Sequence, residues 1–226
     1  MGGDETTAID AAAEKVILAR FEDLDVTIVS EEAGVRGNGE TYVVVDPIDG
    51  SLNAKRGIGF FSLSIAVASG PTMGDVDFGF VHDFGTGEEW TATRGEGAHL
   101  NGEPLAGQLP KDEIEILCFE ATRTTAIAEK AAAVVDLAYR LRIMGSLALS
   151  LCHLAAGRVD AVCSLKPARA VDIAAAQLLV LERGLAIDLF EAQPLGAAPL
   201  DLEGRSRVAA AGTPELCRKL ASALSA

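Results

Sequence analysis

The spacing of apolar residues changes near residue 112, and this change limits the folds that the chain can adopt. Before that point apolar residues alternate singly with small or polar ones, as in half-buried antiparallel strands. After it, short apolar runs alternate with segments of helical spacing, as in layered α/β proteins. No internal repeat or Ser/Pro-rich linker interrupts the chain. We therefore predict one unit over residues 1–226, with an α+β half over about residues 1–111 and an α/β half over about residues 112–226.

The first half is predicted to hold one amphipathic helix followed by antiparallel strands. Apolar residues from Ile9 to Ile17 recur at helical spacing, which predicts a helix that runs to about Arg20. Five predicted strands complete this half. In the first two, apolar residues do not alternate clearly with polar ones, and an Asn-Gly pair, a favoured hairpin turn, follows the last. The strands are Val26 to Val29, Tyr42 to Val45, Phe61 to Ala68, Val76 to Phe80 and Glu88 to Thr93, with the turn at Asn101-Gly102.

The second half alternates between strands and helices, and its last helix has a Pro in the first turn. The predicted strands are Ile114 to Phe119, Leu141 to Met144, Val159 to Cys163 and Arg207 to Ala211. The predicted helices are Ala126 to Tyr139, Ser146 to Ala156, Asp172 to Arg183 and a final helix that starts at Thr213-Pro214. The expected fold class is α/β (α+β), with stacked α-β-α-β layers.

Charge limits the partners of this chain. The formal net charge is −14, which argues against nucleic acid or an anionic membrane as the primary partner. No apolar run is long enough to span a membrane and no leader pattern precedes the first helix, so we expect a cytoplasmic protein. The four cysteines form no CxxC pair and are expected to be reduced core residues, and a zinc site built from His and Cys has little support.

Acidic residues follow two of the predicted buried strands directly. The segment from Asp46 to Ser51, Asp-Pro-Ile-Asp-Gly-Ser, comes after one of them, and Glu31-Glu32 comes after the other. Taken alone, the first segment could be a simple β-turn. Two strands that deliver carboxylates at their ends instead indicate one cation site. Asp172, at the start of an apolar helix, is either a third ligand or a helix cap.

Oxygen ligands without an accompanying His or Cys cluster favour Mg²⁺, Mn²⁺ or Ca²⁺ over zinc, and Mg²⁺ is the simplest choice. The spacing of Asp46 and Asp49 would let one carboxylate bridge two ions, and the Ile48 carbonyl could add another oxygen. Two ions about 3.5 to 4 Å apart are a common apparatus for phosphoryl transfer. Bound cations would also let so acidic a chain accept an anionic substrate.

Two glycine-led segments could present backbone N–H groups to a phosphate. Gly50-Ser51 follows the acidic segment, and Gly145-Ser146 precedes an apolar helix, where Ser146 could equally be an ordinary N-cap. Asp10, with Asp4 and Thr7 upstream, lies at the start of the first helix, where acids also serve simply to satisfy the helix dipole.

Several of these segments together resemble the inositol monophosphatase superfamily of Mg²⁺-dependent, lithium-sensitive sugar and inositol phosphatases. The matching segments follow one another in the family's order over residues 3 to about 185. They are Gly3-Asp4-x-x-Thr7-x-x-Asp10, Glu31-Glu32, Asp46 to Ser51 with Asn53, Gly145-Ser146 with Cys152-x-x-Ala155-x-Gly157-x-x-Asp160, and Val171 to Ala175. Gly3 to Thr6, Ile58-x-Phe60-Phe61 and Arg169 to Asp172 are most similar to the archaeal-type enzymes that act on both inositol monophosphates and fructose 1,6-bisphosphate.

The resemblance implies a set of metal ligands. Glu31, Asp46 and the Ile48 carbonyl would hold one ion, and Asp46, Asp49 and Asp172 would hold a second. A third, loosely held ion is expected as well.

The resemblance also implies roles toward the phosphate. Ser51 stands where the family's nucleophile-orienting Thr usually stands, and Asp10 would bond to it so that the pair activates a water. Gly50, Ser51 and Leu52 would present backbone N–H groups to the scissile phosphate. No covalent phosphoenzyme is implied.

The chain departs from the family pattern at three places. The family usually has a further helix and a metal-proximal loop before Asp4, so we expect either a late start codon or a shortened variant. Val171 replaces a usual Trp, as the archaeal-type branch tolerates. The stretch from Leu165 to Arg169 lacks the hydroxyl-binding acid of many inositol-specific members, so inositol specificity is not implied.

These features together predict a single phosphatase unit, a Mg²⁺-dependent phosphomonoesterase that acts on a small phosphorylated metabolite and forms a homodimer. The expected substrates are inositol 1-phosphate and fructose 1,6-bisphosphate. The alternatives are an adenosine 3′,5′-bisphosphate phosphatase and a regulatory binding protein on the same fold. Arg142, Lys166 and Arg169 flank two motif segments, and they are either a cradle for a second phosphate or ordinary surface cations.

Overall fold

Two β-sheets with helices between and outside them make up the protein, as seen in a computed structural model that describes residues 8–106, 113–120, 123–191 and 194–225. The eight strands of the first sheet are arranged in the order β2-β1-β3-β4-β5-β6-β7-β8. They are β1 (Val26–Ser30), β2 (Gly34–Arg36), β3 (Thr41–Asp49), β4 (Ser62–Ala68), β5 (Val76–Asp83), β6 (Glu89–Thr93), β7 (Gly97–Leu100) and β8 (Glu103–Pro104).

The second sheet has five strands in the order β10-β9-β11-β13-β12. They are β9 (Ile114–Glu120), β10 (Ala138–Arg142), β11 (Ala161–Ser164), β12 (Ala186–Leu189) and β13 (Val208–Ala211). The helices are α1 (Ala8–Leu18), α2 (Ser51–Arg56), α3 (Thr124–Ala131), α4 (Leu147–Ala155), α5 (Ala170–Glu182) and α6 (Pro214–Ser225).

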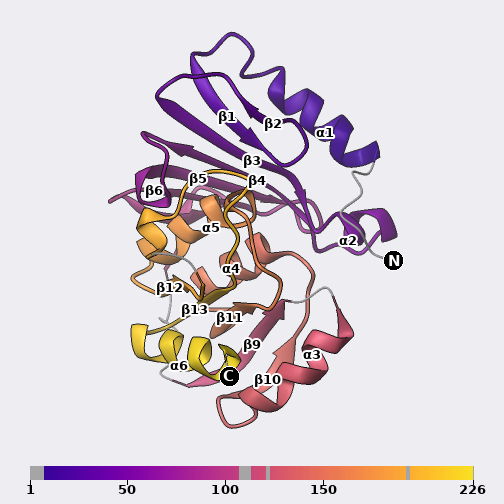
Figure 1. Ribbon diagram of the computed structural model, residues 1–226, viewed down its shortest axis with the longest axis vertical. Coiled ribbons are helices and arrows are strands. Elements are labelled where there is room, and N and C mark those ends of the chain that lie inside the picture. Colours follow the sequence, from indigo (N-terminus) through magenta and orange to yellow (C-terminus); the bar gives the residue numbers. More distant parts are fainter. Residues whose placement is uncertain (1–7, 107–112, 121–122, 192–193, 226) are drawn as a thin grey trace.

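The elements stack in layers, with α4 and α5 between the two sheets (Figure 1). Helix α1 lies on the outer side of the first sheet, and α6 lies with α3 on the outer side of the second (Figure 1). The core follows the same layers, because nearly every residue of α4 is buried and α5 is buried over most of its length. The predicted α-β-α-β layering is confirmed, and α3 and α6 form one more outer layer.

One pair of strands runs parallel in an otherwise antiparallel first sheet. β1 pairs in parallel with β3, with Ser30 opposite Val45, whereas the other neighbours in this sheet are antiparallel. Both strands therefore end at the same edge of the sheet. The next residues in this register, Glu31 after β1 and Asp46 within β3, are brought side by side by this pairing.

The predicted helix from Ala126 to Tyr139 is wrong in its second half. Helix α3 ends at Ala131, a 3₁₀ turn follows, and β10 already begins at Ala138, so the strand predicted for Leu141 to Met144 starts earlier. The cause is a tertiary interaction, since Ala138 to Arg142 pair in parallel with β9. Hydrogen bonds to β9 satisfy the backbone groups that would otherwise be paired within a helix. β2, β12 and the short α2 were not among the predicted elements.

Close packing of α5 on β5 depends on a glycine. A Cβ on Gly79 would lie 2.5 Å from the Ala175 carbonyl oxygen of α5, which is far inside van der Waals contact. The helix can approach the sheet this closely only because Gly79 has no side chain.

Gly79→Ala should therefore lower the free energy of unfolding by about 1–3 kcal/mol, because α5 must move away from the sheet. Gly59→Ala is a matched control, since a Cβ there meets the Gly85 Cα at 3.5 Å, an ordinary contact. Urea unfolding of both variants measures the difference. Equal stability of the two would show that α5 moves away without cost.

Candidate metal and phosphate site

Three carboxylates from three different elements meet at one edge of the first sheet. One oxygen from each of Glu31, Asp46 and Asp172 lies within 4.8 Å of the others. Glu31 follows β1, Asp46 lies on β3, and Asp172 lies in the first turn of α5. Asp46 is only 2% exposed, and the other two are half-buried. The three acids that the sequence predicted to share a cation site are thus brought together.

Asp49 connects this edge of the sheet with helix α4. A shift in register between Asp46 and Asp49 interrupts the pairing of β3 with β4. The Asp49 carboxylate accepts hydrogen bonds from the Ser146 hydroxyl at 2.6 Å and from the Ala148 N–H at 2.7 Å. Ser146 also caps α4, because its hydroxyl accepts from the Leu149 N–H at 3.2 Å. Ser146 is therefore both the N-cap of α4 and a hydrogen-bond donor to Asp49.

The guanidinium of Arg169 lies against the acidic cluster. Arg169 Nη2 lies 2.6 Å from Glu31 Oε1 and 2.9 Å from Asp172 Oδ1. The Arg169 backbone N–H donates to the second Asp172 oxygen at 2.7 Å, so Asp172 also caps its own helix. The side chain of Arg169 is 14% exposed. It is therefore part of the site and not a free surface cation.

Burial and mutual repulsion disfavour the charged forms of Glu31, Asp46 and Asp49. Burial raises the pKa of Asp46 well above its usual range, and the neighbouring Asp49 and Glu31 carboxylates raise it further. Burial likewise raises the pKa of Asp49 to about 7, although the Ser146 hydroxyl and the Ala148 N–H oppose the shift. Burial also raises the pKa of Glu31 despite Arg169 beside it. The cluster is short of positive charge.

The donor set fits a hard divalent cation. Three carboxylates, those of Glu31, Asp46 and Asp172, form a group of oxygen ligands that could hold a metal. Asp49 is not part of this group, because its carboxylate is turned to Ser146 and Ala148. The Ile48 carbonyl accepts a hydrogen bond from the Ser51 hydroxyl at 3.0 Å and retains a second lone pair. Oxygen ligands of this kind select Mg²⁺, Mn²⁺ or Ca²⁺.

The phosphate-binding residues predicted from sequence lie beside the cluster. Gly50 and Gly145 both have left-handed backbone conformations, with φ of 95° and 93°. A Cβ on Gly50 would lie 3.1 Å from the Gly145 carbonyl oxygen, so these two segments pack backbone against backbone. Ser51 begins α2, and the Leu52 side chain is 67% exposed.

Three further predicted residues lie on other elements. Arg142 lies at the end of β10, and its guanidinium donates to the Leu141 carbonyl at 2.9 Å. Lys166 lies in the loop between β11 and α5, where its carbonyl accepts a bond from the Ser164 hydroxyl. Asp10 lies on α1, and its side chain, together with Asp4 and Thr7, lies outside the described part of the structure.

Two buried acids that were not predicted from the sequence accept hydrogen bonds from the turns beside the site. Glu14 on α1 accepts hydrogen bonds from the Ser30 hydroxyl at 2.5 Å and from the Glu32 and Ala33 N–H groups at 3.2 and 2.7 Å. It thereby fixes the turn that carries Glu31. The available signal was an acid on the inward face of an amphipathic helix. Glu120, at the end of β9, similarly holds the turn before α4.

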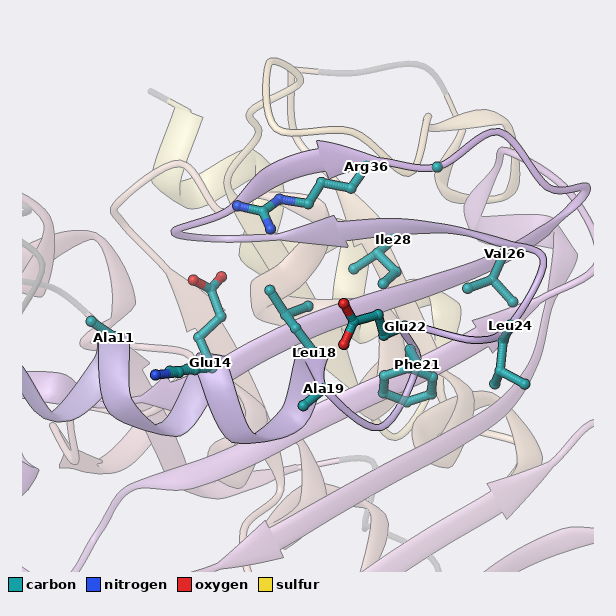
Figure 2. A pocket seen from close by; sticks show the side chains of 12 residues that line it. Ala11, Glu14, Leu18, Ala19, Phe21, Glu22, Leu24, Val26, Ile28 and Arg36 are labelled. Atoms are coloured by element: carbon teal, nitrogen blue, oxygen red, sulfur yellow. The ribbon is translucent and has the colours of Figure 1, made fainter.

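Glu14 also borders a groove of about 540 Å³ between α1 and the β1–β2 hairpin (Figure 2). Apolar side chains such as Leu18 and Ile28 line it together with the charged Arg36 and Glu22 (Figure 2). Neither Asp49 nor any of the three clustered carboxylates lines it. The groove is therefore separate from the acidic site.

The prediction that the four cysteines are core residues is confirmed. Cys118, Cys152, Cys163 and Cys217 are all buried and free. Among the described residues, no helix is long and apolar enough to cross a membrane.

A layered α/β fold with carboxylates gathered at one end of its strands fits the class of phosphoric monoester hydrolases. Comparison with known proteins identifies the family within this class. Residues 2–226 match the family model described as the inositol monophosphatase family. The chain belongs to this family.

Its relatives include archaeal enzymes. A fructose-1,6-bisphosphatase/inositol-1-monophosphatase from Methanothermobacter thermautotrophicus is 35% identical over 98% of this chain and 84% of its own length. A fructose-1,6-bisphosphatase from Pyrococcus furiosus is 37% identical over 82% of this chain and 70% of its own. A solved structure from Pyrococcus horikoshii, described as similar to inositol-1 monophosphatase, superposes with a TM-score of 0.83 at 29% identity, covering 98% of this chain and 86% of that one.

The raised pKa values predict how stability varies with pH when metal is removed by a chelator. The native state holds protons on acids such as Asp49 that the unfolded chain has already released, so stability is greatest below the unfolded pKa of about 4. Stability should then fall as the pH rises from about 4 to 7. Asp49→Asn should reduce this fall, because the amide does not titrate.

Thermal melting in EDTA at several pH values measures the effect. Asp23→Asn, an exposed acid with the same change in net charge, is the control and should follow the parent protein. A slope for Asp49→Asn equal to that of the control would contradict the buried, raised pKa of Asp49.

Proposed function

We propose that this protein is a Mg²⁺-dependent phosphomonoesterase that hydrolyses inositol 1-phosphate, fructose 1,6-bisphosphate or both. The observation that carries the proposal is the convergence of Glu31, Asp46 and Asp172 within 4.8 Å at the ends of β1 and β3 and the start of α5. Two or three ions would bind, and Mn²⁺ is the natural substitute for Mg²⁺.

The proposed ligands of the first ion are Glu31, Asp46 and the Ile48 carbonyl, and those of the second are Asp46, Asp49 and Asp172. Such ions, when bound, lower the pKa of a water so that it can attack phosphorus, and they neutralise charge on the leaving oxygen. The protein's contribution is to hold the ligands near one another, as the convergence of Glu31, Asp46 and Asp172 supports. Asp49 is aimed by Ser146 and by the first turn of α4.

The residues that follow Asp49 are proposed to bind the phosphate. The first N–H groups of a helix have no partner within the helix, so Ser51 and Leu52 can donate to phosphate oxygens together with Gly50. The Ser51 hydroxyl, which donates to the Ile48 carbonyl, is proposed to orient the attacking water with help from Asp10. Asp10 lies on α1, the helix that packs against β3.

The substrate proposal draws on the archaeal relatives, whose names join fructose-1,6-bisphosphatase with inositol-1-monophosphatase. A second candidate function is regulatory binding, because the "Nus factor SuhB" of Pasteurella multocida is 36% identical over 80% of this chain. Adenosine 3′,5′-bisphosphate is a third phosphorylated substrate to test. We propose a homodimer in each case.

Phosphate release from a panel of substrates with Mg²⁺ tests the proposal. The panel should contain inositol 1-phosphate, fructose 1,6-bisphosphate and adenosine 3′,5′-bisphosphate, each with and without EDTA. We expect release from the first two that EDTA abolishes. A well-folded protein that releases no phosphate from any of them would favour the regulatory function.

Asp49→Asn and Asp172→Asn should each lower phosphate release by orders of magnitude, since each removes a charged ligand from a site that concentrates positive charge. The native fold should persist in both variants, so thermal melting is measured alongside activity. Near-normal turnover by a folded Asp49→Asn protein would exclude the two-ion arrangement.

Arg142 tests the proposed cradle for a second phosphate. It precedes Gly145-Ser146, and its exposed guanidinium could grip a phosphate bidentately, whereas inositol 1-phosphate offers only hydroxyls at that end. Arg142→Ala should therefore raise the KM for fructose 1,6-bisphosphate much more than that for inositol 1-phosphate. Arg169 is a poorer probe, because its loss would also unbalance Glu31 and Asp172.

The matched control is Arg140→Ala. Arg140 lies two residues earlier on the same strand, carries the same charge and pairs with Glu115 at 3.0 Å. It should leave both KM values close to those of the parent protein. If the two variants change KM alike, the effect is one of overall charge and Arg142 is not part of a cradle.

A further inference from the structure

Glu120 is a buried carboxylate to which the sequence analysis gave no role. It ends β9 and is 7% exposed. It accepts hydrogen bonds from the Met144 N–H at 3.2 Å, from the Gly145 N–H at 2.9 Å and from the Ser150 hydroxyl at 2.8 Å. Two of these three donors belong to the turn that leads into α4.

The same turn is held from the opposite side by Asn53 of α2. The Asn53 side-chain amide donates to the Met144 carbonyl at 2.8 Å and to the Phe60 carbonyl at 2.8 Å. The N–H of Met144 is thus held by the second sheet, through Glu120, and its carbonyl by an element of the first half, through Asn53.

This turn has little room to move. Gly145 adopts φ of 93°, and a Cβ there would lie 2.8 Å from Asn53 Nδ2. The Gly145 carbonyl in turn lies 3.1 Å from where a Cβ of Gly50 would be. A side chain at either glycine would force the turn away from Asn53 or Gly50, and a displaced turn would lose its hydrogen bonds to Glu120 and Asn53.

The next residue in the chain is Ser146, whose hydroxyl donates to Asp49. The position of Ser146, and of the α4 N–H that also reaches Asp49, therefore depends on where the turn is held. We infer that Glu120 and Asn53 are positioning residues that together aim Ser146 and the start of α4 at Asp49. The inference rests on the proposed function, in which Asp49 is a metal ligand.

The competing explanation is that Glu120 merely ties β9 to α4 through Ser150. Glu120→Gln separates the two, because it keeps the shape of the side chain but turns one acceptor oxygen into a donor NH₂, which must then face the N–H of Met144 or Gly145. Ser150→Ala is the matched control, since it removes the bond from Glu120 to α4 and leaves both bonds from the turn to Glu120 in place.

The decisive readout is the affinity for Mn²⁺ alone, measured by calorimetry, with kcat and KM as a second readout. We expect Glu120→Gln to weaken Mn²⁺ binding by about 10–100-fold, as is typical when a residue behind a metal ligand is changed. Ser150→Ala should bind Mn²⁺ as the parent protein does. Asn53→Ser should weaken binding as well, and it serves alone if Glu120→Gln does not fold.

The double variant tests whether both residues act on one turn. If they do, Glu120→Gln combined with Asn53→Ser should weaken Mn²⁺ binding by less than the product of the two single changes. Multiplicative losses, or a Glu120→Gln protein that binds Mn²⁺ as tightly as Ser150→Ala, would overturn the inference. A parent protein that binds Mn²⁺ but releases no phosphate would instead overturn the proposed function and leave this inference standing.

Discussion

Mutual repulsion among buried carboxylates is the constraint on which the rest of this site depends. Asp46 is almost fully buried, and the negative charges of Glu31, Asp49 and Asp172 further disfavour its charged form. Water would screen such charges on the surface, but in the interior they must be neutralised by protons or by cations. Arg169 supplies one positive charge, which leaves an excess of negative charge. The fold therefore favours the binding of cations by these carboxylates.

The architecture concentrates these acids by strand and helix geometry. Parallel pairing of β1 with β3 places Glu31 beside Asp46, and the start of α5 adds Asp172 from the layer between the sheets. Glu31 directly follows β1, Asp172 lies in the first turn of α5, and Asp46 is the last residue of β3 before its register with β4 shifts. The buried acids behind them, Glu14 and Glu120, accept several N–H and O–H bonds each, so that the turns around the site are held without further positive charge.

The sequence predicted the layered fold and the acids of the cluster because both depend on local patterns. Asp46 and Asp49 follow the apolar run Tyr42 to Val45 directly and lie in the last part of β3, so their place could be inferred from neighbouring residues. Glu120 could not be found in this way, since its partners lie 24 to 30 residues further along the chain. The error at Tyr139 has the same origin, because pairing with β9 outweighs a helical pattern that is only local.

The site lies where the two halves of the chain meet, so the packing between the halves determines which hydrogen-bond donors surround Asp49. Asp49 belongs to the first sheet, but its hydrogen-bond donors belong to α4, which follows a strand of the second. The contact between Gly50 and Gly145 leaves no space for side chains at this junction. A change that shifts one sheet against the other must therefore alter the donors around Asp49 before it exposes much of the core. Activity should thus be more sensitive than global stability to substitutions along this boundary, since only Asp49 and its neighbours need precise placement.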